Sequence, residues 1–379
     1  MYHSTLRLIS ALEQPERLCR RLKGLRLIRD ADGQPCYSVG NNAVVFRIEL
    51  HGRMRRLRCY RIRPAIDLEA IYGEKLLRDE LFVHTNDRQG EWIDVVLDDW
   101  VEGDTLDIVM DWALQNRDTC LLYELSRRFD ALAAGLLADE WAHGDLKPEN
   151  IVVTPDGSLR LIDFDARFLP SMQGRTSAEL GTPTYQHPGR TAENFDRWLD
   201  HYPATLISVQ LRALALDPAL HDRHSAPGEY LIHPSRLFDD DPCPAYDEVL
   251  DLFARMGDAI HYRLARALKQ PCYRLSGVEE LFDGTAPQPP ADTPPAFYME
   301  RGLCGFRTGD RIVIPPVYDE ALDFREGVAA VRLAALWHYI DTAGNPVFHC
   351  PPDCDAAKSL RNGFARYRCR GIWQEHSIK

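Results

Sequence analysis

The polar run His143-Gly144-Asp145-Leu146-Lys147-Pro148-Glu149-Asn150 constrains this chain more than any other feature. Two short apolar segments follow it, separated by the pair Asp156-Gly157, and a second acidic motif, Asp163-Phe164-Asp165, comes directly after them. Because Asp-Gly supplies the turn geometry of a tight hairpin, residues 151–162 are predicted to form a β-hairpin. The sequence therefore places two polar motifs on either side of a hairpin.

The residue types in these motifs suit phosphoryl transfer. That reaction requires a carboxylate beside the acceptor hydroxyl, a cation on the transferring phosphate, and oxygen ligands that hold Mg²⁺ on the nucleotide. Lys147 is informative because only six of the 45 basic residues are lysines, so a basic position in this chain is usually arginine.

The two motifs, with their spacing, strongly resemble the catalytic loop and the metal-binding motif of bacterial eukaryotic-type protein kinases. The resemblance implies that Asp145 is the catalytic base, that Lys147 contacts the γ-phosphate of ATP, and that Asn150 and Asp163 bind Mg²⁺. Small-molecule kinases share the His-Gly-Asp loop, but the continuation Lys-Pro-Glu-Asn favours the protein Ser/Thr type.

An upstream segment fits the phosphate-covering loop of the same family. Ser38, Gly40, Ala43 and Val45 occupy the positions of its glycine-rich turn, with one glycine retained, and small residues let backbone N–H groups approach phosphate. An ordinary hairpin turn is the alternative. On the next expected strand, Arg58 stands where the family has its nucleotide-binding lysine.

Arg58 leaves two interpretations open, because a planar guanidinium does not replace an ammonium group without rearrangement. Either an adapted pocket tolerates the arginine, or the site binds nucleotide without efficient transfer. A further alternative treats the six arginines between residues 53 and 63 as a surface for polyanions, but few aromatic residues are interleaved with them.

Other nucleotide contacts are expected around these strands. A helix is predicted over residues 66–77, and by resemblance Glu74 on it is the carboxylate partner of Arg58, with Glu69 as the alternative. Asp99 and Val101, at the end of an expected strand, resemble the hinge that offers backbone hydrogen bonds to adenine.

Two expectations concern the loop downstream of the hairpin. Residues 181–188 resemble the end of an activation segment, and Asp200 is expected to brace the backbone of the catalytic loop. The family usually has arginine at position 144 and glycine at position 165, where this chain has Gly144 and Asp165. Without that arginine we expect no obligatory phosphorylation of the activation segment.

The C-terminal part is internally repetitive. The segment from Ile314 to Asp319, which contains Pro-Pro, recurs 36 residues later, and Trp337 then corresponds to Trp373. These features resemble the WG β-repeats of bacterial proteins, which implies an interaction role. A repeat this short cannot bury its own apolar face, so neighbouring repeats are expected to stack.

Strand-like segments first and helical segments later predict an α+β chain, a bilobal protein kinase-like fold with an added all-β repeat module. The expected boundaries are an N-terminal helical extension over 1–29, a kinase-like domain over 30–283, a proline-rich linker over 284–297 and the repeat module over 298–379. The leading functional hypothesis is an ATP- and Mg²⁺-dependent Ser/Thr protein kinase. The alternative is a pseudokinase scaffold that binds nucleotide or a partner protein without efficient transfer.

Composition narrows the class of partner. The net charge of −12 argues against a nucleic-acid binder that works by overall charge, and no segment reads as a signal peptide or a membrane span. The ten scattered cysteines are expected to be reduced thiols, as in a cytoplasmic protein. We expect a protein substrate or regulator as partner, recruited through the repeats, whereas the sequence indicates no oligomeric state.

Overall fold

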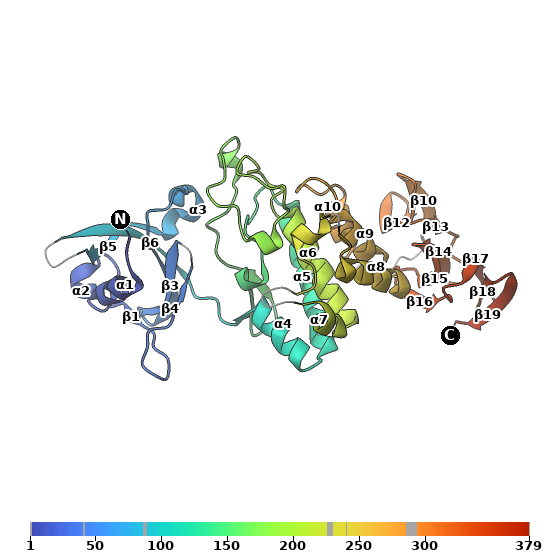
Figure 1. Cartoon of the computed structure of the whole chain (residues 1–379), viewed down its shortest axis with the longest axis horizontal. Coiled ribbons are helices and arrows are strands. Elements are labelled where there is room, and N and C mark those ends of the chain that lie inside the picture. Colours follow the sequence, from blue (N-terminus) through green and yellow to red (C-terminus); the bar gives the residue numbers. More distant parts are fainter. Residues whose placement is uncertain are drawn as a thin grey trace.

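The computed structural model describes residues 2–40, 42–85, 89–225, 230–239, 241–285 and 294–378. The chain is of the α+β class. Figure 1 shows three parts in a row along the longest axis: an N-terminal sheet, a helical region and a C-terminal group of small sheets. The order of the parts follows the order of the sequence.

The N-terminal sheet is antiparallel, with strand order β1-β3-β4-β6-β5 and β2 paired to β3. Strands β3 and β4 are joined by a tight turn through His51 and Gly52. Both turn residues have positive φ, which suits a two-residue hairpin loop. The strands are β1 (Arg26–Leu27), β2 (Tyr37–Val39), β3 (Ala43–Leu50), β4 (Arg53–Tyr60), β5 (Leu76–His84) and β6 (Gly90–Asp99).

Two short helices, α1 (Thr5–Leu12) and α2 (Pro15–Leu18), pack on one face of this sheet. Leu8 and Leu12 lie in the same buried cluster as Phe46 and Ile48, because the apolar side chains of α1 recur on one side of the helix. The predicted N-terminal extension thus supplies part of the core of the sheet and is not a separate appendage.

The helix predicted over residues 66–77 is shorter in the structure. Helix α3 spans Leu68–Tyr72, a single 3₁₀ turn covers Gly73–Lys75, and strand β5 begins at Leu76. Gly73 has a φ of +50°, which ends the helix. Strand β5 is not predicted by the sequence pattern.

The helical region holds the large apolar core of the molecule, built around the almost entirely buried helix α6. The predicted hairpin is present as β8 (Ile151–Val153) and β9 (Leu159–Leu161), and β7 (Asp104–Thr105) adds a third strand. The helices are α4 (Leu106–Gln115), α5 (Thr119–Ala138), α6 (His201–Leu216), α7 (Ala219–His224), α8 (Pro244–Met256), α9 (Ala259–Ala267) and α10 (Val278–Asp283).

The C-terminal part confirms the predicted repeat. Strands β14 and β15 recur 36 positions later as β18 and β19. The two-residue turns within these pairs, 334–335 and 370–371, both have positive φ. The strands are β10 (Ala296–Glu300), β11 (Leu303–Thr308), β12 (Arg311–Tyr318), β13 (Glu320–Ala321), β14 (Val328–Leu333), β15 (Leu336–Asp341), β16 (Pro346–His349), β17 (Cys354–Arg361), β18 (Phe364–Cys369) and β19 (Ile372–Ser377).

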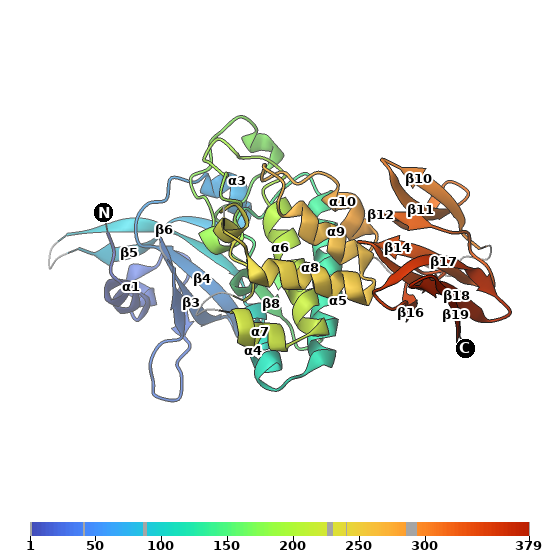
Figure 2. The same ribbon diagram turned by 45° about the vertical axis from the view of Figure 1, so that its right-hand side comes forward.

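The repeat strands pack directly against the helical region, as Figure 2 shows for β12 and β16 beside α9 and α8. Ala259 of α9 belongs to the same buried cluster as Phe306 and Ile314. Arg263 donates from Nε to the carbonyl oxygen of Val317 at 2.7 Å. Most of the predicted linker, residues 286–293, lies outside the described residues.

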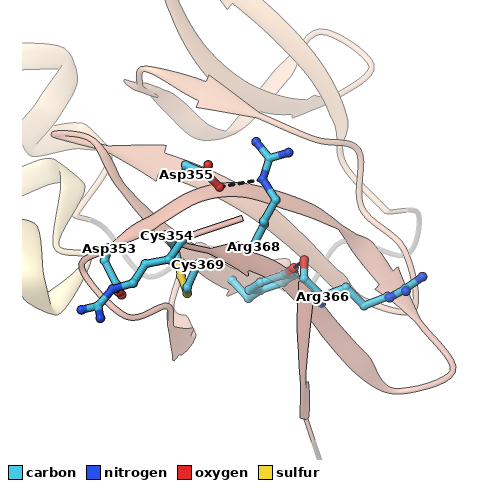
Figure 3. Close-up of a disulfide and its surroundings, with 8 residues drawn as sticks. Asp353, Cys354, Asp355, Arg366, Arg368 and Cys369 are labelled. Carbon is cyan, nitrogen blue, oxygen red and sulfur yellow. Dashed lines mark hydrogen bonds and ion pairs between the residues drawn. A yellow bond between two sulfur atoms is a disulfide. The ribbon is translucent and has the colours of Figure 1, made fainter. Parts of the chain in front are cut away.

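Two of the ten cysteines form a disulfide, contrary to the expectation of reduced thiols. Cys354 and Cys369 are directly opposite each other on β17 and β18, and Figure 3 shows the bond between them. The register of the strand pair brings the two Cα atoms to 4.1 Å, a proximity that spacing along the chain does not reveal. Among the described residues, none of the helices combines the length and the apolar character that a membrane crossing requires.

Candidate functional site

The polar run that begins at His143 forms a loop between α5 and β8, and the Asp200 side chain holds the backbone of this loop. The Asp200 carboxylate accepts hydrogen bonds from the backbone N–H groups of His143, at 2.5 Å, and Gly144, at 2.9 Å. Asp200 is buried, and burial raises its pKa even though these contacts oppose the shift. The expected bracing role of Asp200 is therefore confirmed as a contact.

Gly144, at a position where the kinases that this sequence resembles usually have arginine, is required by the backbone. Its φ is +81°, and a Cβ atom at this position would lie 2.1 Å from the carbonyl oxygen of Ala166. A guanidinium reaches the loop from elsewhere, because Nη1 of the buried Arg190 donates to the Gly144 carbonyl at 2.8 Å. The loop is thus held by a buried arginine of the protein itself. That the activation segment needs no obligatory phosphorylation stays a prediction.

Asp145, Lys147 and Asn150 lie together on this loop. The Asn150 side-chain amide donates to the backbone carbonyl of Asp145 at 2.8 Å and to its Oδ2 at 3.3 Å. Nζ of Lys147 lies 3.5 Å from the same Oδ2. From the segment expected to end an activation loop, Thr182 donates its backbone N–H to Oδ1 of Asp145 at 2.6 Å and accepts from Lys147 at 2.8 Å.

Asp163 follows strand β9 and reaches the same place. The backbone carbonyl of Asn150 accepts a hydrogen bond from Ile162, which fixes Asp163 beside the loop, and Asp163 adopts a left-handed φ of +66°. Its Oδ1 accepts from Nη2 of Arg58 at 2.6 Å, across 105 positions of sequence. Burial would raise the pKa of Asp163, but Arg58 lowers it, so the carboxylate is ionised at neutral pH.

Arg58 is the cation that links the sheet to the helical region. Its side chain is 7% exposed, and its Nη1 donates to Oδ2 of Asp165 at 2.6 Å. The prediction that Glu74 or Glu69 pairs with Arg58 is wrong. Glu74 is exposed on the 3₁₀ turn after the short helix α3, and Glu69 pairs with Arg78 at 3.1 Å.

The residues predicted to form the phosphate-covering loop lie on β2, on β3 and in the turn between them. Ala43 and Val45 stand opposite Tyr60 and Arg58 in the β3–β4 register, so all four share the sheet face that carries Arg58. Ser38 and Gly40 are exposed at the end of β2 and the start of its turn.

The predicted hinge residues lie at the end of strand β6 and directly after it. Asp99 ends β6 and forms an exposed ion pair with Arg55 at 3.0 Å, and Val101 follows it, half-buried. Arg56 pairs with Asp98 at 3.1 Å. Arg55, Arg56 and Arg58, three of the six arginines between residues 53 and 63, are paired with carboxylates, which leaves less positive charge on β4 for a polyanion.

The donor set fits Mg²⁺ chemically. Asp163 and Asn150 offer hard oxygen ligands, and two protein oxygens completed by nucleotide oxygens are the usual way in which proteins bind this ion. Asp163 uses one oxygen for Arg58 and is 41% exposed, so the other oxygen remains accessible. Among the described residues, His, Cys, Asp and Glu side chains cluster as a further potential ligand set at Asp353, Cys354 and Cys369, but the two sulfurs there are already bonded to each other.

Sequence reasoning missed two contacts that close this site. Asp165 is the buried partner of Arg58, and its only signal was the departure from the usual glycine. Nδ2 of Asn42 donates to Oε1 of Glu179 at 2.8 Å, joining the turn after β2 to the segment that ends at Thr182. Nothing in the local sequence pattern connects positions so far apart.

Comparison with known families identifies the C-terminal part. Residues 308–337 match the family described as WG containing repeat, which agrees with the predicted repeat module. The match runs from the last residue of β11 to the start of β15 and does not reach the candidate site. No curated protein matches the chain.

Proposed function

We propose that residues 30–283 form a bilobal protein kinase-like domain that transfers phosphate from ATP to serine or threonine hydroxyls of a protein. The WG repeat region then serves as the interaction module that recruits the substrate or a regulator. The single observation that carries this proposal is the convergence of Arg58, Asp145, Lys147, Asn150 and Asp163, which are dispersed over 105 positions, on one site between the sheet and the helical region.

Each residue has a distinct part in the proposed reaction. Asp145 takes the proton of the acceptor hydroxyl as the new oxygen–phosphorus bond forms and the bond to the leaving nucleoside diphosphate breaks. Lys147, within 3.5 Å of Asp145, stabilises negative charge on the transferring group. Asn150 and Asp163 would hold Mg²⁺, which when bound supplies charge neutralisation on the nucleotide oxygens.

The hydrogen bonds of Thr182 favour a hydroxyl acceptor beside Asp145. This residue contacts both Asp145 and Lys147, so the loop that contains it sets the position of an incoming hydroxyl relative to the base. The Thr182 N–H and the Asn150 amide both donate to the Asp145 carboxylate, so that group is oriented before substrate arrives, which lowers the cost of alignment. The proposal therefore assigns Thr182 to the substrate side of the site.

One observation favours the second candidate, a pseudokinase scaffold. Asp163 is already neutralised by Arg58 at 2.6 Å, and that ion pair competes with Mg²⁺ for the same carboxylate. If the pair persists with nucleotide present, the site binds ligand without efficient transfer and the repeat module supplies the function.

The deciding experiment incubates the full chain with labelled ATP, Mg²⁺ and a generic protein acceptor. Wild type is compared with Asp145→Asn and Asp163→Ala, and with Asp156→Asn as a matched control. Asp156 is an aspartate of the neighbouring hairpin turn whose contacts are to Thr154 and Ser158. The kinase proposal expects wild type and Asp156→Asn to transfer label, and both site variants to lose transfer by at least about 100-fold.

Equal, negligible transfer by all four proteins would overturn the enzyme proposal. A nucleotide-dependent rise in the unfolding temperature of wild type that is absent from Asp163→Ala would in that case support the scaffold. Labelling of a small metabolite in place of protein would shift the assignment to a small-molecule kinase.

A further inference from the structure

A buried carboxylate at Asp165 collects three donors from two separate elements. Its Oδ2 accepts from Nη1 of Arg58 at 2.6 Å, and its Oδ1 accepts from the hydroxyls of Tyr60, at 2.9 Å, and Tyr72. Arg58 and Tyr60 lie on β4, and Tyr72 ends α3. Asp165 is 7% exposed, so a full set of partners replaces the water that an ionised carboxylate otherwise needs.

Three departures from the kinase pattern meet at this point. The chain has arginine where the family has its lysine, aspartate where it has the last glycine of the metal motif, and no helix glutamate within reach of the cation. The arginine and the aspartate contact each other, so the arginine needs no glutamate from the helix as a partner. Because the guanidinium and the carboxylate pair with each other, the two substitutions together form one structural change.

The two Nη nitrogens of Arg58 donate to different carboxylates. Nη1 faces Asp165, which is buried and held by both tyrosines, whereas Nη2 faces Asp163, which is 41% exposed. Burial raises the pKa of Tyr60 and of Tyr72, and the nearby Asp165 raises both further, so both hydroxyls remain neutral donors at physiological pH. Nη1 of Arg58 is therefore held by a buried partner, while Nη2 faces the exposed side of the site.

We propose that Asp165 is the positioning residue for Arg58, taking the place of the helix glutamate, so that Nη2 of Arg58 is presented to the phosphate groups of a bound nucleotide. This inference rests on the proposed nucleotide site. It predicts that Asp165 acts on phosphate recognition through Arg58 and not on adenosine recognition. Arginine suits this role because its planar fork serves two acceptors at fixed angles, which a lysine ammonium on a flexible stem does not.

The test measures binding of Mg²⁺-ADP and of adenosine by calorimetry, together with the unfolding temperature of the free protein. Asp165→Asn is compared with wild type and with Glu80→Gln. Glu80 is a matched control because it is a fully buried carboxylate of the same sheet, paired with Arg21 at 2.8 Å in a separate cluster. Both variants are expected to lower the unfolding temperature, because each replaces a buried, hydrogen-bonded carboxylate by a neutral amide.

Only Asp165→Asn is expected to weaken Mg²⁺-ADP binding, by about tenfold or more, with adenosine binding unchanged. The double variant Arg58→Lys, Asp165→Asn should bind Mg²⁺-ADP no more weakly than Arg58→Lys alone, since the second residue acts through the first. Equal loss of ADP and adenosine binding, unchanged ADP binding in Asp165→Asn, or additive losses in the double variant would each overturn the positioning role. Absence of any nucleotide binding by wild type would instead refute the proposed function itself.

Discussion

Replacing Gly144 by alanine tests how tightly the loop of residues 143–150 is held. A left-handed backbone costs a non-glycine residue about 1–2 kcal/mol. The added Cβ would also lie 2.1 Å from the Ala166 carbonyl oxygen, and overpacking of this kind costs roughly 1–3 kcal/mol. We therefore expect Gly144→Ala to lower the free energy of unfolding by about 2–5 kcal/mol.

The surrounding contacts leave the alanine little room to relax. Ala142 and Phe168 exchange two backbone hydrogen bonds, of 3.2 and 3.0 Å, which hold the Ala166 segment against the loop. On the other side, Asp200 binds the N–H groups of residues 143 and 144. Relief of the overlap therefore requires the loop or its partner segment to give up hydrogen bonds.

The assay is thermal unfolding followed by helical ellipticity. A change of 1 kcal/mol shifts the midpoint by about 2–4 °C in a domain of this size, so Gly144→Ala should unfold roughly 4–20 °C below wild type. Gly135→Ala is the matched control, because Gly135 is exposed on α5 and a Cβ there meets no atom within 4 Å. It should be neutral or stabilising by up to about 1 kcal/mol. Coincident transitions for the two variants would refute this account of the loop.

Three further outcomes are expected. Burial lowers the pKa of His261, but two neighbouring carboxylates outweigh this effect and raise the pKa to about 9. The contribution of His261 to stability is therefore complete below about pH 6.5 and is lost as the pH rises through 9. An imidazole NMR titration near 6.5 would contradict this. Reducing the Cys354–Cys369 disulfide, which closes a loop of sequence separation 15, should destabilise the last repeat by about 3 kcal/mol and speed amide exchange in β18. Exchange in the Cys354→Ser variant should not respond to reductant. Identical exchange in both redox states would show that the disulfide does not contribute to stability. Arg263→Ala removes two hydrogen bonds to the repeat module and should cost about 1–3 kcal/mol with faster amide exchange in β12. An unchanged exchange rate would mean that apolar packing alone fixes the module.

Local signals in the sequence predicted much of the fold. Asp156-Gly157 predicted its hairpin because Gly157 has a positive φ, which few residues other than glycine adopt. The 36-residue offset predicted the recurring strands of the C-terminal part because equivalent turns repeat with it. Strand β5 was missed because the helical pattern assigned to residues 66–77 runs into its first two residues, after the helix has already ended at Gly73.

The site was predicted only as a set of residue types. The chain by itself determined that a carboxylate, a lysine and an amide lie on one loop, because their spacing is local and their chemistry belongs to the side chains. Only the tertiary structure decided the partner of Arg58, because the sheet and the segment after β9 meet there across 107 positions and the helix that should carry Glu74 is too short. The disulfide was decided in the same way, by the register of two strands, which no spacing along the chain reveals.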